Sequence, residues 1–295
     1  MDLKELLKGI AEGNFLALAR SLTLVENNLG VSVELLRTMN IRPTVPVIGI
    51  TGPPGAGKST LVNAIVNYYV AADRKVGILA VDPTSPFNHG SLLGDRIRMA
   101  QQFNHPNVFI RSVATRGALG GISTKTVEMV DVMRAAAFDL ILVETVGVGQ
   151  SELEIAGLAD RTVVVLVPEA GDEIQHIKSG LMEIAQAFVV NKADREGADA
   201  FANNLKKIIH RHTTIPVFKT TAFKEIGIAP LCEWLERPLL TDNSNKKHLM
   251  AEKAYRFIQD YRMRSFDKDA LFEAVSQAVE SPDFNFYRFV DQWAT

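Results

Sequence analysis

The chain has 295 residues, of which 47% are hydrophobic and 22% are charged, and its formal net charge at pH 7 is −2. This balance argues against the strongly basic surface that binds nucleic acid or acidic membranes. The single cysteine, Cys232, excludes an internal disulfide and suits a reducing compartment. The chain shows no signal peptide, and no apolar run approaches the roughly 20 residues of a membrane-spanning helix. We therefore expect a protein of the cytoplasm, or of a similar reducing lumen, with no nucleic-acid or membrane partner.

The first segment of the chain, residues 1–44, carries apolar residues at steps of three and four, beginning at Leu3, Leu6 and Leu7. This spacing is the period of an amphipathic helix. We therefore expect an N-terminal extension of two or three helices ahead of the main domain.

The main domain is expected over residues 45–240, where the pattern changes to short apolar runs separated by helical segments. The predicted strands are residues 45–50, 75–81, 107–113, 138–144, 161–167, 187–192 and 215–220. Most of these runs are continuously apolar, which is typical of strands covered on both faces of a parallel sheet. Their alternation with helices predicts right-handed βαβ units and an α/β fold with a doubly wound, mostly parallel sheet.

The last segment, residues 241–295, begins with the polar stretch TDNSNKKH, which predicts a linker. Beyond it, apolar residues from Met250 to Tyr261 and the segment KDALFEAVSQAVE have helical spacing. This C-terminal helical extension either covers the main domain or forms an interface between subunits.

A phosphate-binding loop is predicted where the first strand ends. Gly52, Gly57, Lys58 and Ser59 satisfy the pattern G-x-x-x-x-G-K-[ST] between a predicted strand and a predicted helix. Small residues let backbone N–H groups surround a phosphate, and the helix directs its positive end at the same anion. Lys58 then reaches the β- and γ-phosphates, and the Ser59 hydroxyl binds Mg²⁺. The predicted nucleotide-binding residues here are Gly52, Pro53, Pro54, Gly55, Ala56, Gly57, Lys58, Ser59 and Thr60.

Acidic residues follow two of the predicted strands, Asp82 in LAVDPTSP and Glu144 in ILVETVGVGQSE. Ligands of open α/β sheets bind at the carboxyl ends of strands, so both carboxylates are expected near Lys58. We predict that they hold the metal together with Ser59, Glu144 at the Walker-B position. Asp95, in GSLLGDRIRMA, lies on a predicted loop that is placed to approach the γ-phosphate and the metal, although an N-cap role is the alternative.

The base is predicted from VVNKAD at residues 189–194, an Asn-Lys-x-Asp run just after an apolar strand. The Asp194 carboxylate accepts two hydrogen bonds from guanine N1–H and the exocyclic amine, donors that adenine does not offer. Asn191 either pairs with the other edge of the base or ties the site to the phosphate loop, and the Lys192 stem lies along the ring. The backbone of Thr221 and Ala222, in KTTAFK, is expected at the guanine O6. These residues favour GTP and GDP over adenine nucleotides.

The ordered set of motifs resembles the methylmalonyl-CoA mutase-associated GTPase family of the MeaB and ArgK type, which is similar to the human methylmalonic aciduria type A protein. The resemblance covers nearly the whole chain and includes GPPGAGKSTLVNA, VDPTSP, GSLLGDRIRM, TRGALGG, ILVETVGVGQSE, AGDEIQHIKSG and VVNKAD. It implies a homodimeric P-loop GTPase of the SIMIBI class that uses Mg²⁺. It also implies that the protein gates delivery of adenosylcobalamin to an acyl-CoA mutase, and protects that mutase.

The resemblance also implies roles for individual segments. It implies that the first switch is residues 82–98 and the second is residues 144–152. It implies a further switch loop in GDEIQHIKSG, where Asp172, Gln175 and Lys178 respond to the partner mutase. The implied catalytic residues are Lys58, Asp82, Glu144 and Gln150. Gln150 lies two residues later than the water-positioning glutamine of a Ras-like pattern, so its role is a hypothesis that the substitution Gln150→Ala tests. No arginine finger is placed by the sequence, and we expect slow hydrolysis that a partner accelerates.

Other functions remain as alternatives. A nickel-insertion GTPase needs soft or imidazole ligands close together, whereas this chain has one cysteine and six scattered histidines. A kinase of a periplasmic amino-acid transport component needs an acceptor site, and the sequence offers no candidate. A non-hydrolysing structural module would not need the intact Lys58, Ser59 and Glu144. The chain also lacks a DxHxxG-like cobalamin signature, so the cofactor is expected to be held by the partner.

Overall fold

The computed structural model describes residues 1–82, 102, 104–114, 124–145, 155–168, 181–209, 215–238, 251, 254–255, 257–259, 261–263 and 266–294. The chain divides into two compact units, Met1–Asp242 and Asn243–Thr295. Among the described residues, no helix is both long enough and apolar enough to cross a membrane.

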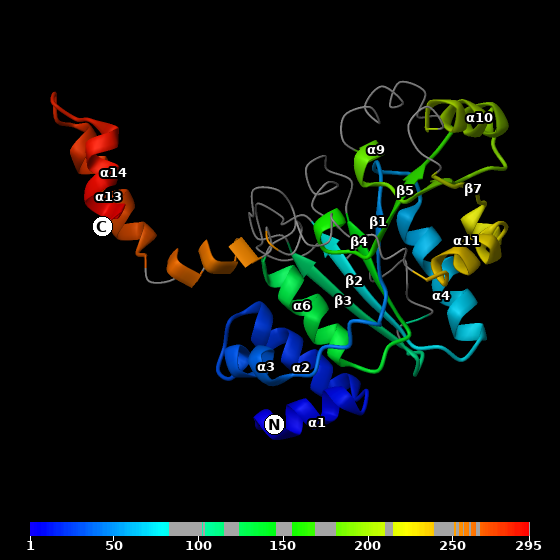
Figure 1. The fold of residues 1–295 in the computed structure, drawn as a ribbon, viewed down its shortest axis with the longest axis horizontal. Coiled ribbons are helices and arrows are strands. Elements are labelled where there is room, and N and C mark those ends of the chain that lie inside the picture. Colours follow the sequence, from blue (N-terminus) through cyan, green and yellow to red (C-terminus); the bar gives the residue numbers. More distant parts are fainter. Residues whose placement is uncertain are drawn as a thin grey trace. The chain divides into compact units, whose positions relative to one another are not determined.

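The first unit is built on a seven-stranded sheet in the order β3-β2-β4-β1-β5-β6-β7, in which every neighbouring pair is parallel (Figure 1). The strands are β1 (Val47–Thr51), β2 (Val76–Asp82), β3 (Val108–Ala114), β4 (Leu140–Thr145), β5 (Arg161–Leu166), β6 (Ala187–Val190) and β7 (Val217–Lys219). Each lies within or shifts by one residue from a predicted strand segment. The predicted doubly wound α/β fold is therefore confirmed.

Helices cover both faces of this sheet (Figure 1). On one face, α4 (Lys58–Ala71) and α11 (Ile228–Leu235) share a core with apolar side chains such as Ile50 and Leu142. On the other face, α6 (Thr124–Ala135) shares a core with Ile141 and Val143, and α10 (Ala198–Ile209) packs where β5 and β6 continue that face. Because β1 and β4 are buried on both sides, their residues are apolar at every position up to the polar ends of the strands.

The shorter elements connect these layers. They are η1 (Ile155–Gly157), α9 (Leu181–Ile184) and η2 (Ala222–Lys224). Of these, η2 matters most for the site because it starts the loop that enters α11.

The first 44 residues form three helices, α1 (Leu3–Ala11), α2 (Phe15–Glu26) and α3 (Ser32–Thr38). Asp2 and Glu5 make a reciprocal capping box at the start of α1, and Asn14 caps α2 through two backbone N–H groups. The helices bury their apolar stripes in the same core as α6 and the sheet. The N-terminal segment is thus an integral layer of the first unit.

The second unit contains α13 (Lys268–Val279) and α14 (Phe286–Ala294). Asp267 caps α13, and an aromatic cluster joins the unit, with the Phe266 and Trp293 ring centroids 5.6 Å apart. No residue of α13 is buried. Apolar side chains on these helices are therefore covered only in part by the described residues of the unit itself.

Candidate nucleotide site

The loop between β1 and α4 is shaped by two glycines that no other residue could replace without strain. Gly52 has a φ of +137°, and a Cβ added to it would lie 2.1 Å from the Val165 carbonyl oxygen. Gly57 has a φ of +84°, and its Cβ would lie 2.5 Å from Asn191 Nδ2. Both the backbone angle and the close approach thus require glycine. The loop leads directly into the N-terminus of α4, where backbone N–H groups lack helical partners and favour an anion.

The two side chains that end the loop motif are both buried. Lys58, whose exposed fraction is 8%, donates hydrogen bonds from Nζ to the carbonyl oxygens of Gly52 at 2.8 Å and Pro53 at 2.9 Å. The lysine thus folds back over the loop that it would serve. Ser59 lies on the first turn of α4 and points to the sheet.

Ser59 and Glu144 meet at the carboxyl end of β4. The Ser59 hydroxyl donates a hydrogen bond of 2.7 Å to Glu144 Oε1, and the Glu144 side chain is nearly fully buried. The next residue, Thr145, donates a hydrogen bond from Oγ1 to Thr51 Oγ1 at 3.0 Å, which aligns the ends of β4 and β1. A hydroxyl and a carboxylate side by side are hard oxygen ligands of the type that Mg²⁺ prefers. The residues present therefore fit the predicted metal.

Of the other predicted metal and catalytic residues, the structure describes only the backbone of Asp82. Asp82 ends β2, and the register pairs Ala80 with Glu144, so the Asp82 backbone lies two residues beyond Glu144 on the neighbouring strand. The Asp82 side chain is outside the described part, as are Asp95 and Gln150 entirely. Their roles stay predictions. The described part also omits Asp172, Gln175, Lys178 and most of the three expected switch segments.

The base side of the site is organised around Asn191, which follows β6. Its Nδ2 donates a hydrogen bond of 3.0 Å to the Ala56 carbonyl oxygen in the phosphate loop. Its Oδ1 accepts hydrogen bonds of 3.1 Å from Thr220 Oγ1 and from the Ala222 backbone N–H. The side chain is only 2% exposed. Of the two arrangements predicted for Asn191, the structure therefore has the one that ties the base loop to the phosphate loop.

The two charged residues of the same motif, Lys192 and Asp194, each contact a neighbouring loop. Lys192, at a φ of +55°, donates a hydrogen bond from Nζ to the Gly55 carbonyl oxygen at 2.8 Å. Asp194 is 35% exposed, and its Oδ2 lies 3.4 Å from Nζ of Lys224 on η2. The Asp194 carboxylate is therefore partly exposed and paired with Lys224.

The end of α11 is anchored by a buried arginine, which holds the helix that follows the base loop. Arg161, the first residue of β5, is 7% exposed. Its guanidinium donates hydrogen bonds to the carbonyl oxygens of Trp234, Leu235, Arg237 and Pro238. These contacts provide donors for the final carbonyl groups of α11 and place a positive charge at the negative end of the helix dipole, which is stabilising. The base loop is thus fixed at both ends, by Asn191 and through α11.

Comparison with known proteins identifies the family of the chain. The model of the family described as "Methylmalonyl Co-A mutase-associated GTPase MeaB" matches residues 18–279. The chain belongs to this family. It is 40% identical over 305 residues to a Pyrococcus abyssi protein that has GTPase in its name, and the match covers 97% of this chain and 94% of that protein. It is 38% identical over 201 residues to the mouse "Methylmalonic aciduria type A homolog, mitochondrial", covering 63% of this chain and 48% of the mouse protein.

A solved structure supports the same fold for this family member. The crystal structure of a protein described as "LAO/AO transport system kinase" superimposes with a TM-score of 0.68 at 25% sequence identity, covering 99% of this chain and 98% of that one. The predicted resemblance and the predicted GTPase activity are confirmed by the family match. Guanine-nucleotide binding follows from that activity.

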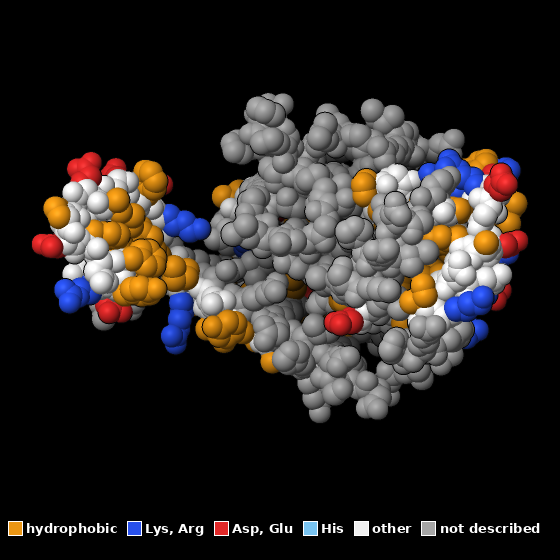
Figure 2. Space-filling view, turned by 90° about the horizontal axis from the view of Figure 1, so that it is seen from above, with side chains coloured by type: hydrophobic (Ala, Val, Ile, Leu, Met, Phe, Trp, Pro, Cys, Tyr) orange, Lys and Arg blue, Asp and Glu red, His pale blue; other side chains and the backbone are white. Residues whose placement is uncertain are grey.

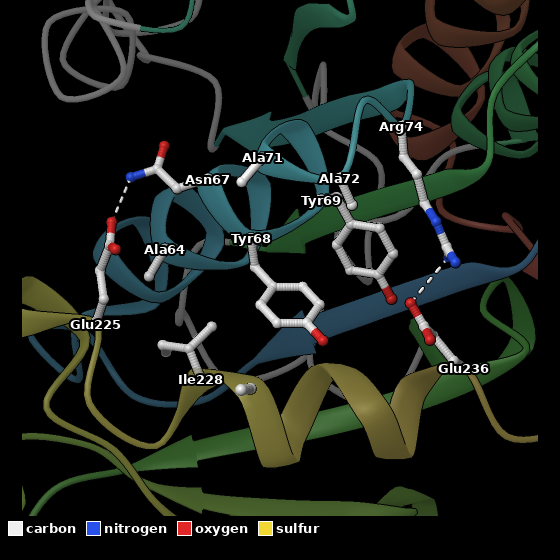
Figure 3. Close-up of a pocket in the computed structure, with 11 residues that line it drawn as sticks. Ala64, Asn67, Tyr68, Tyr69, Ala71, Ala72, Arg74, Glu225, Ile228 and Glu236 are labelled. Carbon is white, nitrogen blue, oxygen red and sulfur yellow. Dashed lines mark hydrogen bonds and ion pairs between the residues drawn. The ribbon is translucent and has the colours of Figure 1, made fainter.

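The family member also has a hollow between two helices, which the sequence did not predict (Figure 3). It has a volume of about 530 Å³ and lies between α4 and α11. At one end Asn67 Nδ2 donates to Glu225 Oε1 at 2.6 Å, and at the other Arg74 pairs with Glu236 at 2.8 Å. The partners are 158 and 162 residues apart in sequence, so no local pattern reveals the pairs. Burial raises the pKa of the adjoining Tyr69 phenol, which therefore lines the hollow as a neutral group.

Histidines and the cysteine offer no metal site in the described part of this family member. No group of three or more His, Cys, Asp or Glu side chains comes together there. Cys232 is fully buried in the core between α4 and α11, and burial raises the pKa of its thiol to about 12. Five of the six histidines, His89, His176, His210, His212 and His248, lie outside the described residues.

Proposed function

We propose that this GTPase couples GTP hydrolysis to the delivery of adenosylcobalamin to an acyl-CoA mutase, either methylmalonyl-CoA mutase or a close relative, and protects that mutase. The observation that carries the proposal is the family match over residues 18–279, because the family description itself names the mutase. The name of the mouse relative, which refers to methylmalonic aciduria, supports the same partner.

In the proposed reaction, water attacks the γ-phosphorus of GTP, the bond to the oxygen bridging the β- and γ-phosphates breaks, and GDP and phosphate leave. Lys58 exchanges its carbonyl partners in the loop for phosphate oxygens and stabilises the charge that spreads over them. Ser59 and Glu144 would hold Mg²⁺, which would supply positive charge to neutralise the phosphates.

The choice of base is assigned to Asp194, whose carboxylate accepts the two guanine donors. Asn191 keeps the Ala222 N–H, the proposed contact of guanine O6, in a fixed position relative to the phosphate loop. The proposed binding mode thus needs both residues, Asp194 as the reader of the base and Asn191 as the link between the two loops.

The output of the cycle is proposed to be conformational. The expected switches begin near the ends of β2 and β4, at Asp82 and Glu144, and Glu144 accepts a hydrogen bond from Ser59 next to the phosphate loop. A change at the γ-phosphate is therefore transmitted to these segments, and through them to the mutase. We expect slow hydrolysis by the protein alone, which the partner accelerates.

We assign the second unit to homodimer formation. Its helices expose large apolar side chains, with exposed fractions of 74% for Phe272, 79% for Tyr287 and 57% for Phe286. Figure 2 shows apolar side chains gathered on this unit. Light scattering on the full chain should give the mass of a dimer, and the double substitution Phe272→Glu, Tyr287→Glu should give a monomer because buried charge is costly. A monomer at micromolar concentration for the unsubstituted chain would contradict this assignment.

The central experiment measures GTP hydrolysis with and without a purified adenosylcobalamin-dependent acyl-CoA mutase from the same source. We expect slow hydrolysis alone, acceleration by the mutase, and no hydrolysis by the Lys58→Ala variant in either condition. A Gln150→Ala variant in the same assay tests the water-positioning hypothesis. Neither binding to nor stimulation by methylmalonyl-CoA or isobutyryl-CoA type mutases would overturn the chaperone proposal and leave the GTPase intact.

A second candidate function rests on the similar solved structure that is described as a transport system kinase. It is tested by adding γ-labelled GTP or ATP to the protein together with an amino-acid transport binding protein. Label transferred to that protein would favour the kinase, whereas release of free phosphate favours hydrolysis.

A further inference from the structure

A lysine on the base loop is paired with the carboxylate that is proposed to read guanine. Lys224 Nζ lies 3.4 Å from Asp194 Oδ2, and the same ammonium lies 4.9 Å from the centroid of the Phe223 ring. The lysine is 50% exposed, so its side chain can adjust without breaking core contacts. By contrast, the Lys192 ammonium is turned to the phosphate loop, where it donates to the Gly55 carbonyl oxygen.

The backbone that carries Lys224 is held firmly. Its N–H donates to the Thr221 carbonyl oxygen at 2.9 Å, and the N–H of Ala222, two residues earlier, donates to Asn191 Oδ1. Gly227, at a φ of +78°, closes the loop so tightly that a Cβ there would lie 2.1 Å from the Lys219 carbonyl oxygen. The ammonium is therefore delivered to Asp194 by a fixed loop.

The ion pair between Lys224 and Asp194 affects how the site accepts bases other than guanine. Guanine offers Asp194 two donors, N1–H and the exocyclic amine, whereas hypoxanthine offers only N1–H. A site rejects a base that lacks a donor mainly because a polar group of the site is then left without a partner. At this site an ammonium with three donors already lies beside the carboxylate, so the oxygen that hypoxanthine leaves open has a partner at hand.

We propose that Lys224 determines base specificity by pairing with the Asp194 oxygen that hypoxanthine leaves open, so that the protein binds and hydrolyses inosine nucleotides as well as guanosine nucleotides. The inference rests on the proposed reading of guanine by Asp194 and deepens it. It extends the substrate class to purine nucleotides with a 6-oxo group and an N1–H.

The test compares dissociation constants of GDP and IDP by isothermal titration calorimetry for the unsubstituted protein and Lys224→Met. Methionine keeps an apolar stem of similar length against Phe223 but removes the charge. An exposed ion pair contributes little, so the ratio of the IDP to the GDP dissociation constant should rise by about two- to fivefold in Lys224→Met, through weaker IDP binding. Lys224→Arg should restore the original ratio, and the effect should shrink with salt.

The matched control is Lys219→Met. Lys219 makes a similar exposed ion pair, to Asp199, and removing it changes the net charge by the same amount without touching Asp194. The ratio should stay unchanged in this variant, and ITP hydrolysis should follow the IDP result.

The outcomes separate this inference from the function on which it rests. An unchanged ratio in Lys224→Met, or an equal loss of GDP and IDP affinity, would refute the role of Lys224 while GDP binding still supports the guanine site. If the unsubstituted protein bound ADP as tightly as GDP, the reading by Asp194 would itself be wrong, and this inference would fall with it.

Discussion

Replacing Asn191 by alanine should destabilise the protein and also weaken nucleotide binding, because this one side chain joins the two loops of the site. Its side chain makes three short hydrogen bonds, with the Ala56 carbonyl oxygen, the Thr220 hydroxyl and the Ala222 N–H, at 3.0 to 3.1 Å, and a longer one of 3.5 Å to the Gly57 carbonyl oxygen. The three short bonds are buried, and the side chain is 2% exposed.

The magnitude follows from these contacts. Each buried hydrogen bond contributes about 1 kcal/mol net, so Asn191→Ala should lower the free energy of unfolding by about 3 kcal/mol. For a unit of this size that corresponds to a fall in Tm of roughly 6 to 12 °C. The loosened base loop must also be ordered again when nucleotide binds. Ordering about one residue costs about 1–2 kcal/mol, which weakens GDP affinity by about tenfold.

The assay is urea unfolding followed by circular dichroism, together with calorimetric titration of GDP. The control is Asn203→Ala, the same change on the exposed side of α10. Its stability should change by less than about 0.5 kcal/mol and its GDP affinity should stay the same. If Asn191→Ala were no less stable than Asn203→Ala and bound GDP equally well, the reasoning that Asn191 links the loops would be refuted.

Two further predictions concern the loop glycines and the buried thiol. Gly52→Ala should abolish GDP binding and lower the free energy of unfolding by several kcal/mol. Gly55→Ala should cost only about 1–2 kcal/mol, because Gly55 has a φ of +77° but no atom lies within 4 Å of the added Cβ. Urea unfolding measures both effects, and equal losses of stability in the two variants would contradict this prediction. Cys232, with its pKa raised to about 12 from an ordinary value near 9.0, should not react with a thiol reagent in the native protein at pH 8 but should react at once in urea. Reaction of the native protein at pH 8 would argue against the burial of this thiol. Because the pKa of the thiol is higher in the folded state than in the unfolded state, it contributes stability below pH 9 that is lost as the pH rises toward 12.

Much of the fold could be predicted because its signals are local. Continuous apolar runs such as VVVL in β5 mark strands buried on both faces, and the loop motif from Gly52 to Ser59 carries its own strand and helix context. The base motif at Asn191 is equally local. Neighbouring residues alone set these features, since they depend on backbone conformation and on the side chains within one turn or one strand.

Other features could not be predicted because they depend on which strands become neighbours. The sequence left two arrangements open for Asn191, and only the packing of β6 near β1 selects its bond to Ala56, 135 residues away. The pairing of Lys224 with Asp194 arises in the same way, from the adjacency of β6 and β7. The hollow between α4 and α11 requires two helices that are far apart in the chain.

The sequence by itself determined the chemistry that this protein holds, namely a phosphate loop, two strand-end carboxylates and a base-reading motif, because each is a short pattern with its own backbone requirement. Only the tertiary structure decided how these parts meet: Ser59 against Glu144, Asn191 against the phosphate loop, and Lys224 against the carboxylate of Asp194. The physical reason is that such contacts join residues whose separation is fixed by strand order and register, and these follow from the packing of the whole sheet rather than from any segment of it.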